Sequence, residues 1–324
     1  MSTVETITEK LPSLTLRQDQ SEESKKEEEY KYAHLLPVFD KDEHFPPLTP
    51  FEHVDPGSRA LNHPNPRAFL DNATSVIEIT PRLGSEVRGV NLAELDNDGR
   101  DQLALEVSIL HLGIFSGKTG PLIVLFSVSL LLHRTKQVAR RGLVVFRDQQ
   151  DFIDRGPEFY LEWGRYFGRL HVHPTSGHPQ GYPELHLVYR DKNSTYNFEQ
   201  QDRVTSTTWH SDVSYELQPP GLTTFFLLAQ PKSGGDTIFT SQVSTLNRLS
   251  PQFVEFLKTL KATHSGFEQA EFSRSGRRGG VVRREPVENV HPVVRKHPVT
   301  GQEALYVNRQ FTRRIVGLKK EESG

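Results

Sequence analysis

The stretch Thr207–Glu216, "TTWHSDVSYE", places His210 and Asp212 two residues apart, directly after a tryptophan. On a flat strand, side chains two residues apart share a face but stand about 6 to 7 Å from each other, which suits two ligands of one ion poorly. At a strand end or in a turn, the same pair can occupy adjacent corners of a coordination sphere. A bare His-x-Asp pair can also be a hydrogen-bonded pair that caps a turn. The surrounding sequence has to decide between these interpretations.

Composition narrows the class of protein before any other motif is considered. At 324 residues with 35% hydrophobic residues, the chain is long enough for one large domain or two small ones. Lys and Arg number 39 against 41 Asp and Glu, so no strong field attracts nucleic acid or an anionic membrane. The chain has no cysteine, which excludes disulfides, thiolate zinc sites and iron–sulfur clusters. Any metal must therefore sit on nitrogen and oxygen ligands.

The first 65 residues are rich in charge and proline and poor in apolar periodicity, as in "QSEESKKEEEYKY". Such a segment cannot bury enough apolar surface to offset its ordering entropy, so we expect residues 1–65 to form a disordered or loosely packed tail. The N-terminus also lacks the basic region and apolar core of a secretory signal, and a cytoplasmic location is expected.

From Ser75 onward, the hydrophobic pattern predicts short strands mixed with a few helices. Alternating residues around a turn with Pro and Gly predict a hairpin over 75–92, and residues 250–264 predict a helix that Ser250 caps, with Pro251 in its first position. Further helices are expected over 98–107 and 151–170, and strands over 140–149, 221–231, 236–241 and 304–316. This mixture favours an antiparallel β core covered by helices.

A nearly unbroken apolar run, residues 121–132, does not fit this pattern. A bilayer span needs roughly 20 apolar residues, so this shorter run predicts no membrane helix. The preceding "GIFSGKT" is similar to a phosphate-binding loop, but Gly113 is one residue too close to Gly117 for that motif, and no clear strand precedes it. A nucleotide-binding function therefore ranks last among the hypotheses, and it would require nucleotide affinity that Lys118→Ala abolishes.

Together with "WHSD", the run "SYELQPPGLTTFFLLAQPKSGGDTIFTS" resembles the TauD/TfdA (taurine dioxygenase) family of Fe(II)- and 2-oxoglutarate-dependent dioxygenases, in its fungal sulfonate-type branch. Further family-like blocks are "RGLVVFRDQ", "FGRLHVHP" and "HPVVRKHPVTGQEALYVNRQFTRRIVGL". These blocks follow one another in the family's order and cover most of residues 75–318. The resemblance implies a mainly β fold with flanking helices, a double-stranded β-helix (jelly roll), in a dioxygenase domain over 66–324.

The resemblance also implies roles for individual residues. His210 and Asp212 would be iron ligands, and Thr237 in "GGDTIFT" would contact the carboxylate of 2-oxoglutarate. His173 in "HVHP" would contact the substrate. For the last two, ordinary interpretations stay open, because a threonine in a strand usually packs and a histidine before proline is usually a turn residue.

Two positions depart from the pattern of the taurine-using members. Ser206 stands where those members carry an amide, and Ser176 stands where they carry a tyrosine. Taurine itself is therefore in doubt as the substrate. Trp209, beside the candidate ligands, is expected to pack as a wall of the metal site.

The function that the resemblance implies is Fe(II)- and 2-oxoglutarate-dependent hydroxylation of a small sulfonate or related organic acid. A sulfonate hydroxylated in this way breaks into sulfite and an aldehyde. Fe(II) would be the cofactor, 2-oxoglutarate the cosubstrate, and a small organic acid and O₂ the partners. No nucleic acid and no membrane are expected, and self-association into a homo-oligomer is common in the family.

In this family, the third iron ligand is a histidine that follows the "FTRRIVGL" block. Downstream of Asp212 the chain carries His264, His291 and His297, and none of them matches that ligand. We therefore expect a C-terminal truncation with an incomplete jelly roll, and an atypical apolar insert at about 108–137, both explained by an imperfect gene model. On this interpretation the chain as written is inactive and poorly soluble. The alternative function is a non-catalytic binding protein that retains part of the metal site.

Overall fold

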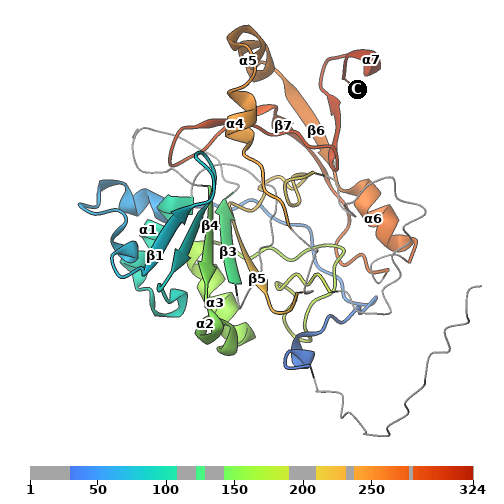
Figure 1. The fold of residues 1–324 in the computed structure, drawn as a ribbon. Helices are drawn as coiled ribbons and strands as arrows, with labels where there is room; N and C mark the ends of the chain where they lie inside the picture. The colour runs from blue at the N-terminus through green and yellow to red at the C-terminus, as the bar shows by residue number, and fades with distance from the viewer. Residues whose placement is uncertain are drawn as a thin grey trace, which may run out of the picture. The chain divides into compact units, whose positions relative to one another are not determined.

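The computed structural model describes residues 30–107, 122–127, 142–189, 209–230, 237–276 and 280–323, with the backbone alone for 122–127. The chain divides into two units, residues 1–33 and 34–324. Figure 1 shows the fold of the second unit, which is described below.

Three β-sheets are found among the described residues. The largest has the strand order β1-β2-β4-β3-β5, and the smaller ones have the orders β10-β6-β7 and β8-β9. Neighbouring strands are antiparallel except for β2 and β4, which are parallel. The strands are β1 (Ser75–Glu78), β2 (Ser85–Arg88), β3 (Leu122–Ser127), β4 (Leu143–Arg147), β5 (Leu222–Leu227), β6 (Lys261–Ser265), β7 (Glu288–Pro292), β8 (Val294–Lys296), β9 (Glu303–Leu305) and β10 (Thr312–Ile315).

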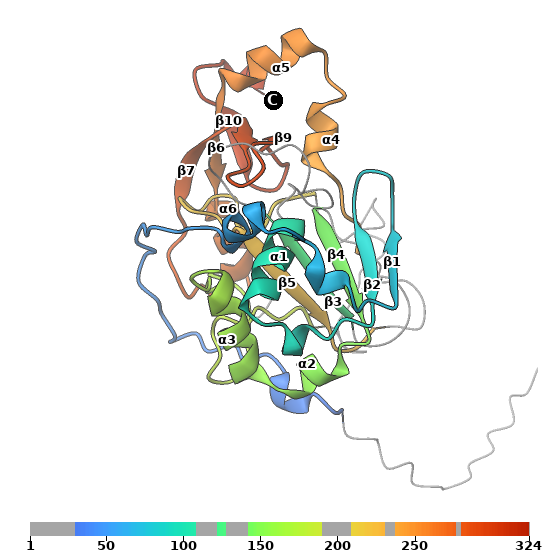
Figure 2. The same cartoon turned by 90° about the vertical axis from the view of Figure 1, so that its left-hand side faces the viewer.

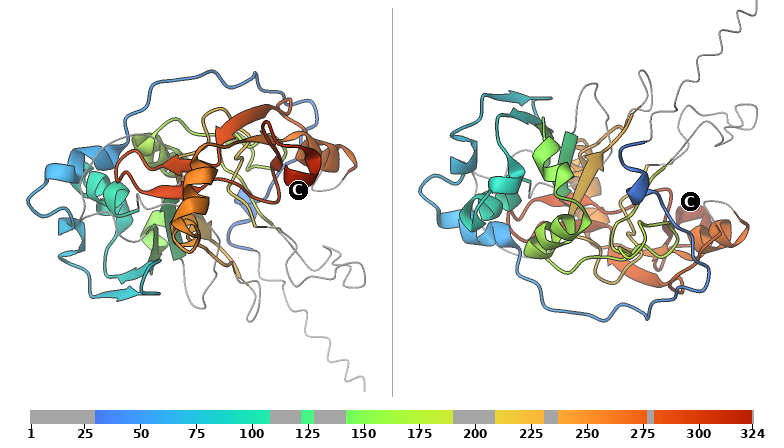
Figure 3. Two further views of the ribbon diagram at one scale, coloured as in Figure 1. Left: turned by 90° about the horizontal axis from the view of Figure 1, so that it is seen from above. Right: turned by 90° about the horizontal axis from the view of Figure 1, so that it is seen from below.

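The helices precede, interrupt and follow these strands. The α-helices are α1 (Asn97–Val107), α2 (Gln150–Asp154), α3 (Pro157–Phe167), α4 (Gln242–Leu246), α5 (Pro251–Lys258), α6 (Phe267–Arg274) and α7 (Lys320–Ser323). The 3-10 helices are η1 (Ala33–Leu35), η2 (Pro56–Asn62), η3 (Ala68–Leu70) and η4 (Leu92–Glu94). Both views in Figure 3 place α1 and its neighbours at the opposite end of the molecule from the C-terminal residues.

The largest sheet is buried on both faces around β4. Val144 and Phe146 pack with residues of α1, α2 and α3, and Figure 2 shows α1 in front of the sheet. Leu143 and Val145 pack on the other side with Tyr306, beyond β9. Because successive side chains of a strand point to opposite faces, a strand covered on both sides has an unbroken apolar sequence. The strand predicted over 140–149 is therefore confirmed.

Part of the apolar run at 121–132 forms an internal strand. β3 lies between β4 and β5, and Val124 is in register with Val145 on one side and with Phe225 on the other. Five of these six residues of the expected insert, 122–126, are thus paired on both edges, and Ser127 pairs with β5 alone. The "GIFSGKT" motif lies outside the described residues, and no helix among the described residues is long and apolar enough to cross a bilayer.

The expectation of a loosely packed tail up to residue 65 is wrong for the segment around η2. Gly57 lies so close to α1 that an added Cβ would stand 2.8 Å from the backbone nitrogen of Leu105. Arg59 Nε donates to Asp101 Oδ2 at 2.6 Å, and Ala60 is buried. Apolar periodicity misses this contact because a glycine backbone, one ion pair and the small side chain of Ala60, which packs with Leu105, make it. Residues 1–29 lie outside the described part.

Other expected elements are confirmed with shifted boundaries. Ser250 Oγ accepts from the Phe253 amide and caps α5, but residues 261–265 leave the helix and form β6. The helix expected over 151–170 is split, because Gly156 adopts φ 83° and Pro157 begins α3. The described residues of the strand expected over 236–241 belong to none of the named strands.

Candidate metal centre

His210 and Asp212 point toward each other. The distance from His210 Nε2 to Asp212 Oδ1 is 3.1 Å, and neither residue belongs to a helix or strand. The imidazole is 18% exposed and the carboxylate 37%, so the pair remains accessible from solvent. The His210 ring packs edge-on against Phe311 on its protected side, with 6.2 Å between the ring centroids.

The spacing of the two donor atoms fits adjacent positions around a metal ion. Ligands at neighbouring corners of an octahedron, with bonds of about 2.1 Å, stand about 3.0 Å apart. The observed 3.1 Å matches this separation, and it equally fits a direct hydrogen bond. No group of three or more His, Asp or Glu side chains that could hold a metal is found among the described residues. The described part of the chain therefore offers one nitrogen and one oxygen ligand.

The electrostatics of Asp212 favour the ionised form that a cation requires. Burial alone would raise the pKa of Asp212, but the hydrogen bond with His210 and the charges of His210, His186 and His171 hold it below its usual value. The carboxylate is therefore ionised at neutral pH.

A strained turn directly follows the pair. Val213 has φ 41°, in the left-handed region that β-branched residues rarely adopt. Holding such a residue there costs about 1 to 3 kcal/mol. The Val213 side chain is 3% exposed and belongs to a cluster with Tyr215 and Phe311, and the Glu216 amide donates to the Val213 carbonyl at 2.9 Å. Packing around the turn thus stabilises a backbone conformation that the residue alone disfavours.

Ser214, next in the turn, is anchored from two other elements. The Asn308 amide donates to Ser214 Oγ at 2.9 Å, and Ser214 Oγ lies 2.9 Å from His264 Nδ1 in β6. The Phe311 amide donates to Asn308 Oδ1, which fixes the orientation of the Asn308 side chain. This chain of hydrogen bonds connects the turn to β6 and to the loop before β10.

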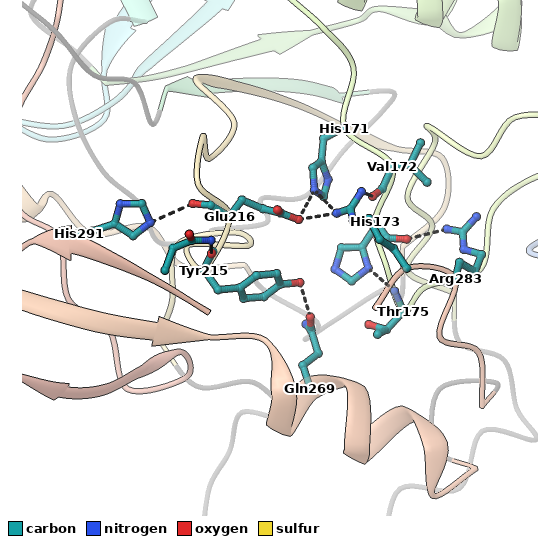
Figure 4. A network of polar contacts seen from close by, with 11 residues as sticks. His171, Val172, His173, Thr175, Tyr215, Glu216, Gln269, Arg283 and His291 are labelled. Atoms are coloured by element: carbon teal, nitrogen blue, oxygen red, sulfur yellow. Dashed lines mark hydrogen bonds and ion pairs between the residues drawn. The ribbon is translucent and has the colours of Figure 1, made fainter. Parts of the chain in front are cut away.

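Glu216, the last residue of the stretch Thr207–Glu216, belongs to a buried network of polar contacts (Figure 4). Its carboxylate accepts from Arg284 Nη2 and lies 3.1 Å from His171 Nε2, and its carbonyl accepts from His291 Nε2 at 2.9 Å. Burial alone would raise the pKa of Glu216, but His171 and Arg284 lower it. An ionised carboxylate thus sits in the interior beside its cationic partner.

Two consecutive arginines hold the "HVHP" segment next to this network. Arg284 Nη1 donates to the Val172 carbonyl at 3.1 Å, and Arg283 Nη2 donates to the His173 carbonyl at 2.9 Å (Figure 4). Arg283 Nη1 also pairs with Glu43 at 3.1 Å. The Glu216 network therefore joins two blocks that are far apart in the sequence.

His173 lies among other imidazoles. Its ring is 4.4 Å from that of His186 and 6.5 Å from that of His171. The Thr175 amide donates to His173 Nδ1 at 3.2 Å, so a neutral His173 carries its proton on Nε2. His171 and His186 also lower the pKa of Asp212, which places this group of imidazoles beside the candidate ligand.

Other residues singled out in the sequence lie in varied surroundings. Thr237 is half-buried and has no hydrogen bond to His210 or Asp212 within the described part of the chain. Trp209 is 54% exposed, so the expectation that it packs as a wall is wrong. Ser176 is buried, and its hydroxyl has no hydrogen-bond partner among the described residues. Ser206 lies outside them.

The downstream histidines are buried and neutral. Burial lowers the pKa of His264 to about 3, that of His291 to about 4 and that of His297 to about 3. His297 Nδ1 accepts from the Val299 and Thr300 amides, and the other two bond to Ser214 and Glu216 as described above.

The sequence reasoning missed several residues that build this site. Glu216 lies inside the quoted block, and the adjacent arginines in "VRRE" are a visible signal for an anchoring pair. His186 stands in no recognisable motif, and Asn308 lies in a family-like block whose pattern gives it no role, so only the fold brings them close.

The profile of the family described as "Taurine catabolism dioxygenase TauD, TfdA family" matches residues 126–324. A protein named "Alpha-ketoglutarate-dependent sulfonate dioxygenase" from Saccharomyces cerevisiae is 41% identical over 300 residues, covering 91% of this chain. The "Alpha-ketoglutarate-dependent dioxygenase cnsP" of Penicillium expansum is 36% identical over 294 residues, covering 90% of this chain and 70% of its own length. This chain belongs to the TauD, TfdA family.

Two further comparisons describe the extent of the similarity. The chain spans 64% of the length of the yeast relative. A taurine dioxygenase structure from Burkholderia xenovorans is 24% identical, with a TM-score of 0.44, and the match covers 78% of this chain and 69% of that one.

Proposed function

We propose that this protein is an Fe(II)- and 2-oxoglutarate-dependent dioxygenase that hydroxylates a small sulfonate or a related organic acid. The observation that carries the proposal is the 3.1 Å separation of His210 Nε2 and Asp212 Oδ1, directly before a strained residue, Val213. Membership of the TauD, TfdA family supports it, as does the 41% identity to the yeast sulfonate dioxygenase. We further propose that the sheets form part of the jelly roll that the family resemblance implies.

In this proposal, His210 and Asp212 would hold iron, and the bound metal would supply the oxidising chemistry with 2-oxoglutarate and O₂. Thr237 would contact the 2-oxoglutarate carboxylate. His173 would donate from Nε2 to the acid group of the substrate, since the Thr175 amide occupies its Nδ1. The Glu216–Arg284 pair would fix the position of His173 relative to the metal ligands, because it connects the two segments that carry them.

A non-catalytic binding protein is the second candidate function. The observation that favours it is that no third His, Asp or Glu completes a metal-binding group with the pair among the described residues. Such a protein would bind the small acid without turning it over.

Turnover assays separate the two functions. Purified protein is supplied with Fe(II), 2-oxoglutarate, O₂ and a panel of small alkyl sulfonates, and succinate and sulfite are measured. The dioxygenase proposal predicts sulfite release that depends on 2-oxoglutarate and is lost in His210→Ala and in Asp212→Ala. His44→Ala, at an exposed histidine, is the matched control and should retain turnover. Turnover that survives both ligand substitutions would contradict the proposal, whereas saturable binding of a sulfonate without any turnover would favour the binding protein.

A further inference from the structure

A cavity of about 570 Å³ lies outside the metal centre, between the β1–β2 turn and the segment that contains α4. Figures 1 and 2 both show α4 beside the tip of the β1–β2 hairpin. Its volume is within the range of about 300 to 1,000 Å³ that small-molecule sites occupy. Its lining consists of Thr80, Pro81, Arg82, Leu83, Phe239, Thr240, Ser241, Ser244, Thr245, Arg248 and Leu249.

The charged side chains that line this cavity are all positive. Arg82 and Arg248 contribute positive charge from the two sides, and the described lining contains no carboxylate. Neither arginine forms an ion pair within the described part of the chain, whereas Arg88, near the same hairpin, pairs with Glu86 and Asp148. Guanidinium groups bind phosphate, sulfonate and carboxylate oxygens through paired N–H donors. The cavity therefore combines two available cations with no internal counter-charge.

Hydrogen bonds hold both walls of the cavity in place. Thr80 Oγ1 donates to the Leu83 carbonyl at 2.7 Å and accepts from the Leu83 amide at 2.8 Å, which closes the β1–β2 turn. Ser241 Oγ accepts from the Ser244 amide at 3.2 Å at the start of α4. The hydroxyls of Thr240 and Ser244 also line the cavity, and no hydrogen bond engages either hydroxyl within the described residues. These two hydroxyl groups thus add hydrogen-bond donors to the cavity, on walls that the hydrogen bonds of Thr80 and Ser241 hold in place.

The remaining lining is apolar and indicates the rest of the ligand. Pro81 and Leu83 contribute from the turn, and Phe239 and Leu249 contribute from the opposite side. A bare inorganic anion would leave this surface and most of the volume unused. An anion with a small apolar body would use both the cations and the apolar wall.

We propose that this cavity binds a small organic anion, with a phosphate, sulfonate or carboxylate head held by Arg82 and Arg248 and an apolar body against Phe239 and Leu249. The lining contains neither His210 nor Asp212, so this site is separate from the proposed metal centre and requires no iron. Phe239 lies two residues after Thr237, so a ligand here contacts the segment that also carries the proposed 2-oxoglutarate contact.

The test uses the full chain in EDTA, with phenyl phosphate, benzenesulfonate, benzoate and inorganic phosphate as probes, and ligand-observed NMR titration as the readout. We expect saturable binding of at least one aromatic anion, tighter than that of inorganic phosphate. Arg82→Gln and Arg248→Gln should each weaken it by about fivefold or more, because a charge-assisted contact is lost. Arg309→Gln, at an exposed arginine outside the cavity, makes the same change in net charge as each cavity variant and should leave the affinity unchanged.

A further variant separates this site from the metal centre. Binding should persist in His210→Ala, whether or not the protein has dioxygenase activity. Binding that is lost in His210→Ala but retained in both cavity variants would place the anion at the metal centre and overturn the proposal. Absence of saturable binding by every probe up to about 10 mM, a concentration well above typical ligand affinities, would overturn it as well.

Discussion

Neutralising Glu216 should destabilise the protein strongly, because the guanidinium of its partner Arg284 is buried and would lose its counter-charge without gaining hydration. The two side chains are 4% and 3% exposed. Glu216→Gln keeps the shape of the side chain but leaves a buried guanidinium without its counter-charge. Breaking a buried pair by removing one partner costs about 3 to 5 kcal/mol. We expect the free energy of unfolding, measured by urea denaturation, to fall by that amount.

A double-mutant cycle shows whether the lost energy belongs to the pair. Glu216→Gln/Arg284→Met removes both charges, so the double variant should be less destabilised than the sum of the single variants, by about 0.5 to 3 kcal/mol. Glu255→Gln is the matched control, because its pair with Lys258 is solvent-exposed, and it should leave stability unchanged. A loss below about 1 kcal/mol in Glu216→Gln, or strictly additive single effects, would refute this account of the pair.

Three further predictions concern the buried histidines, the contact of η2 with α1 and the strained turn. Burial lowers the pKa of His264 to about 3, of His291 to about 4 and of His297 to about 3, so the unfolded chain binds more protons below about pH 6.5. The stabilisation from these neutral histidines should be fully present above that pH, and the free energy of unfolding should fall between about pH 6 and pH 4 by about 1.4 kcal/mol per pH unit for each histidine. His297→Asn, which keeps an acceptor for the Val299 amide, should reduce this slope by one such increment in urea titrations. An unchanged slope would contradict a buried, neutral His297. Gly57→Ala should destabilise by about 1 to 3 kcal/mol, since its Cβ would meet the Leu105 nitrogen at 2.8 Å, whereas Ser58→Ala should have little effect; equal thermal midpoints for the two variants would disprove the close approach. Ser214→Ala leaves the Asn308 amide without its acceptor and should cost about 1 to 3 kcal/mol while weakening Mn²⁺ binding; unchanged stability and unchanged metal affinity would show that Ser214 does not anchor the turn.

The local pattern of the sequence predicts several elements well, because each depends on nearby residues. The hairpin of β1 and β2 follows from alternating side chains around a turn with Pro and Gly. The start of α5 follows from Ser250 and Pro251, which supply a capping oxygen and a fixed φ. Its end was predicted too late, since "KATH" is compatible with a helix until β7 and β10 pair with it as β6.

Features that depend on distant residues escape this kind of reasoning. The run that contains Leu122–Ser127 was assigned to an insert because it shows no polar alternation, and its pairing with β4 and β5 depends on residues elsewhere in the chain. The packing of Gly57 on α1 carries no apolar signal.

The candidate site shows the same division between local and distant information. The spacing of His210 and Asp212 predicted a pair at a strand end or in a turn, and the structure places them 3.1 Å apart in a segment that leads into the turn at 212–215. Their support comes from Arg284, His264 and Asn308, which lie about 50 to 95 residues further along the chain. No spacing rule connects such residues, because a pattern within one segment cannot encode which distant segment packs against it.

Paramagnetic broadening by Mn²⁺ measures most directly whether His210 and Asp212 hold a metal. The chain has two tryptophans, and Trp209 adjoins His210 while Trp163 is buried near α1. In protein labelled with fluorotryptophan, Mn²⁺ should broaden the ¹⁹F signal of Trp209 well before that of Trp163. His210→Ala and Asp212→Ala should each abolish the selective effect. Equal broadening of both signals, or selective broadening that persists in both variants, would contradict a metal centre at this pair.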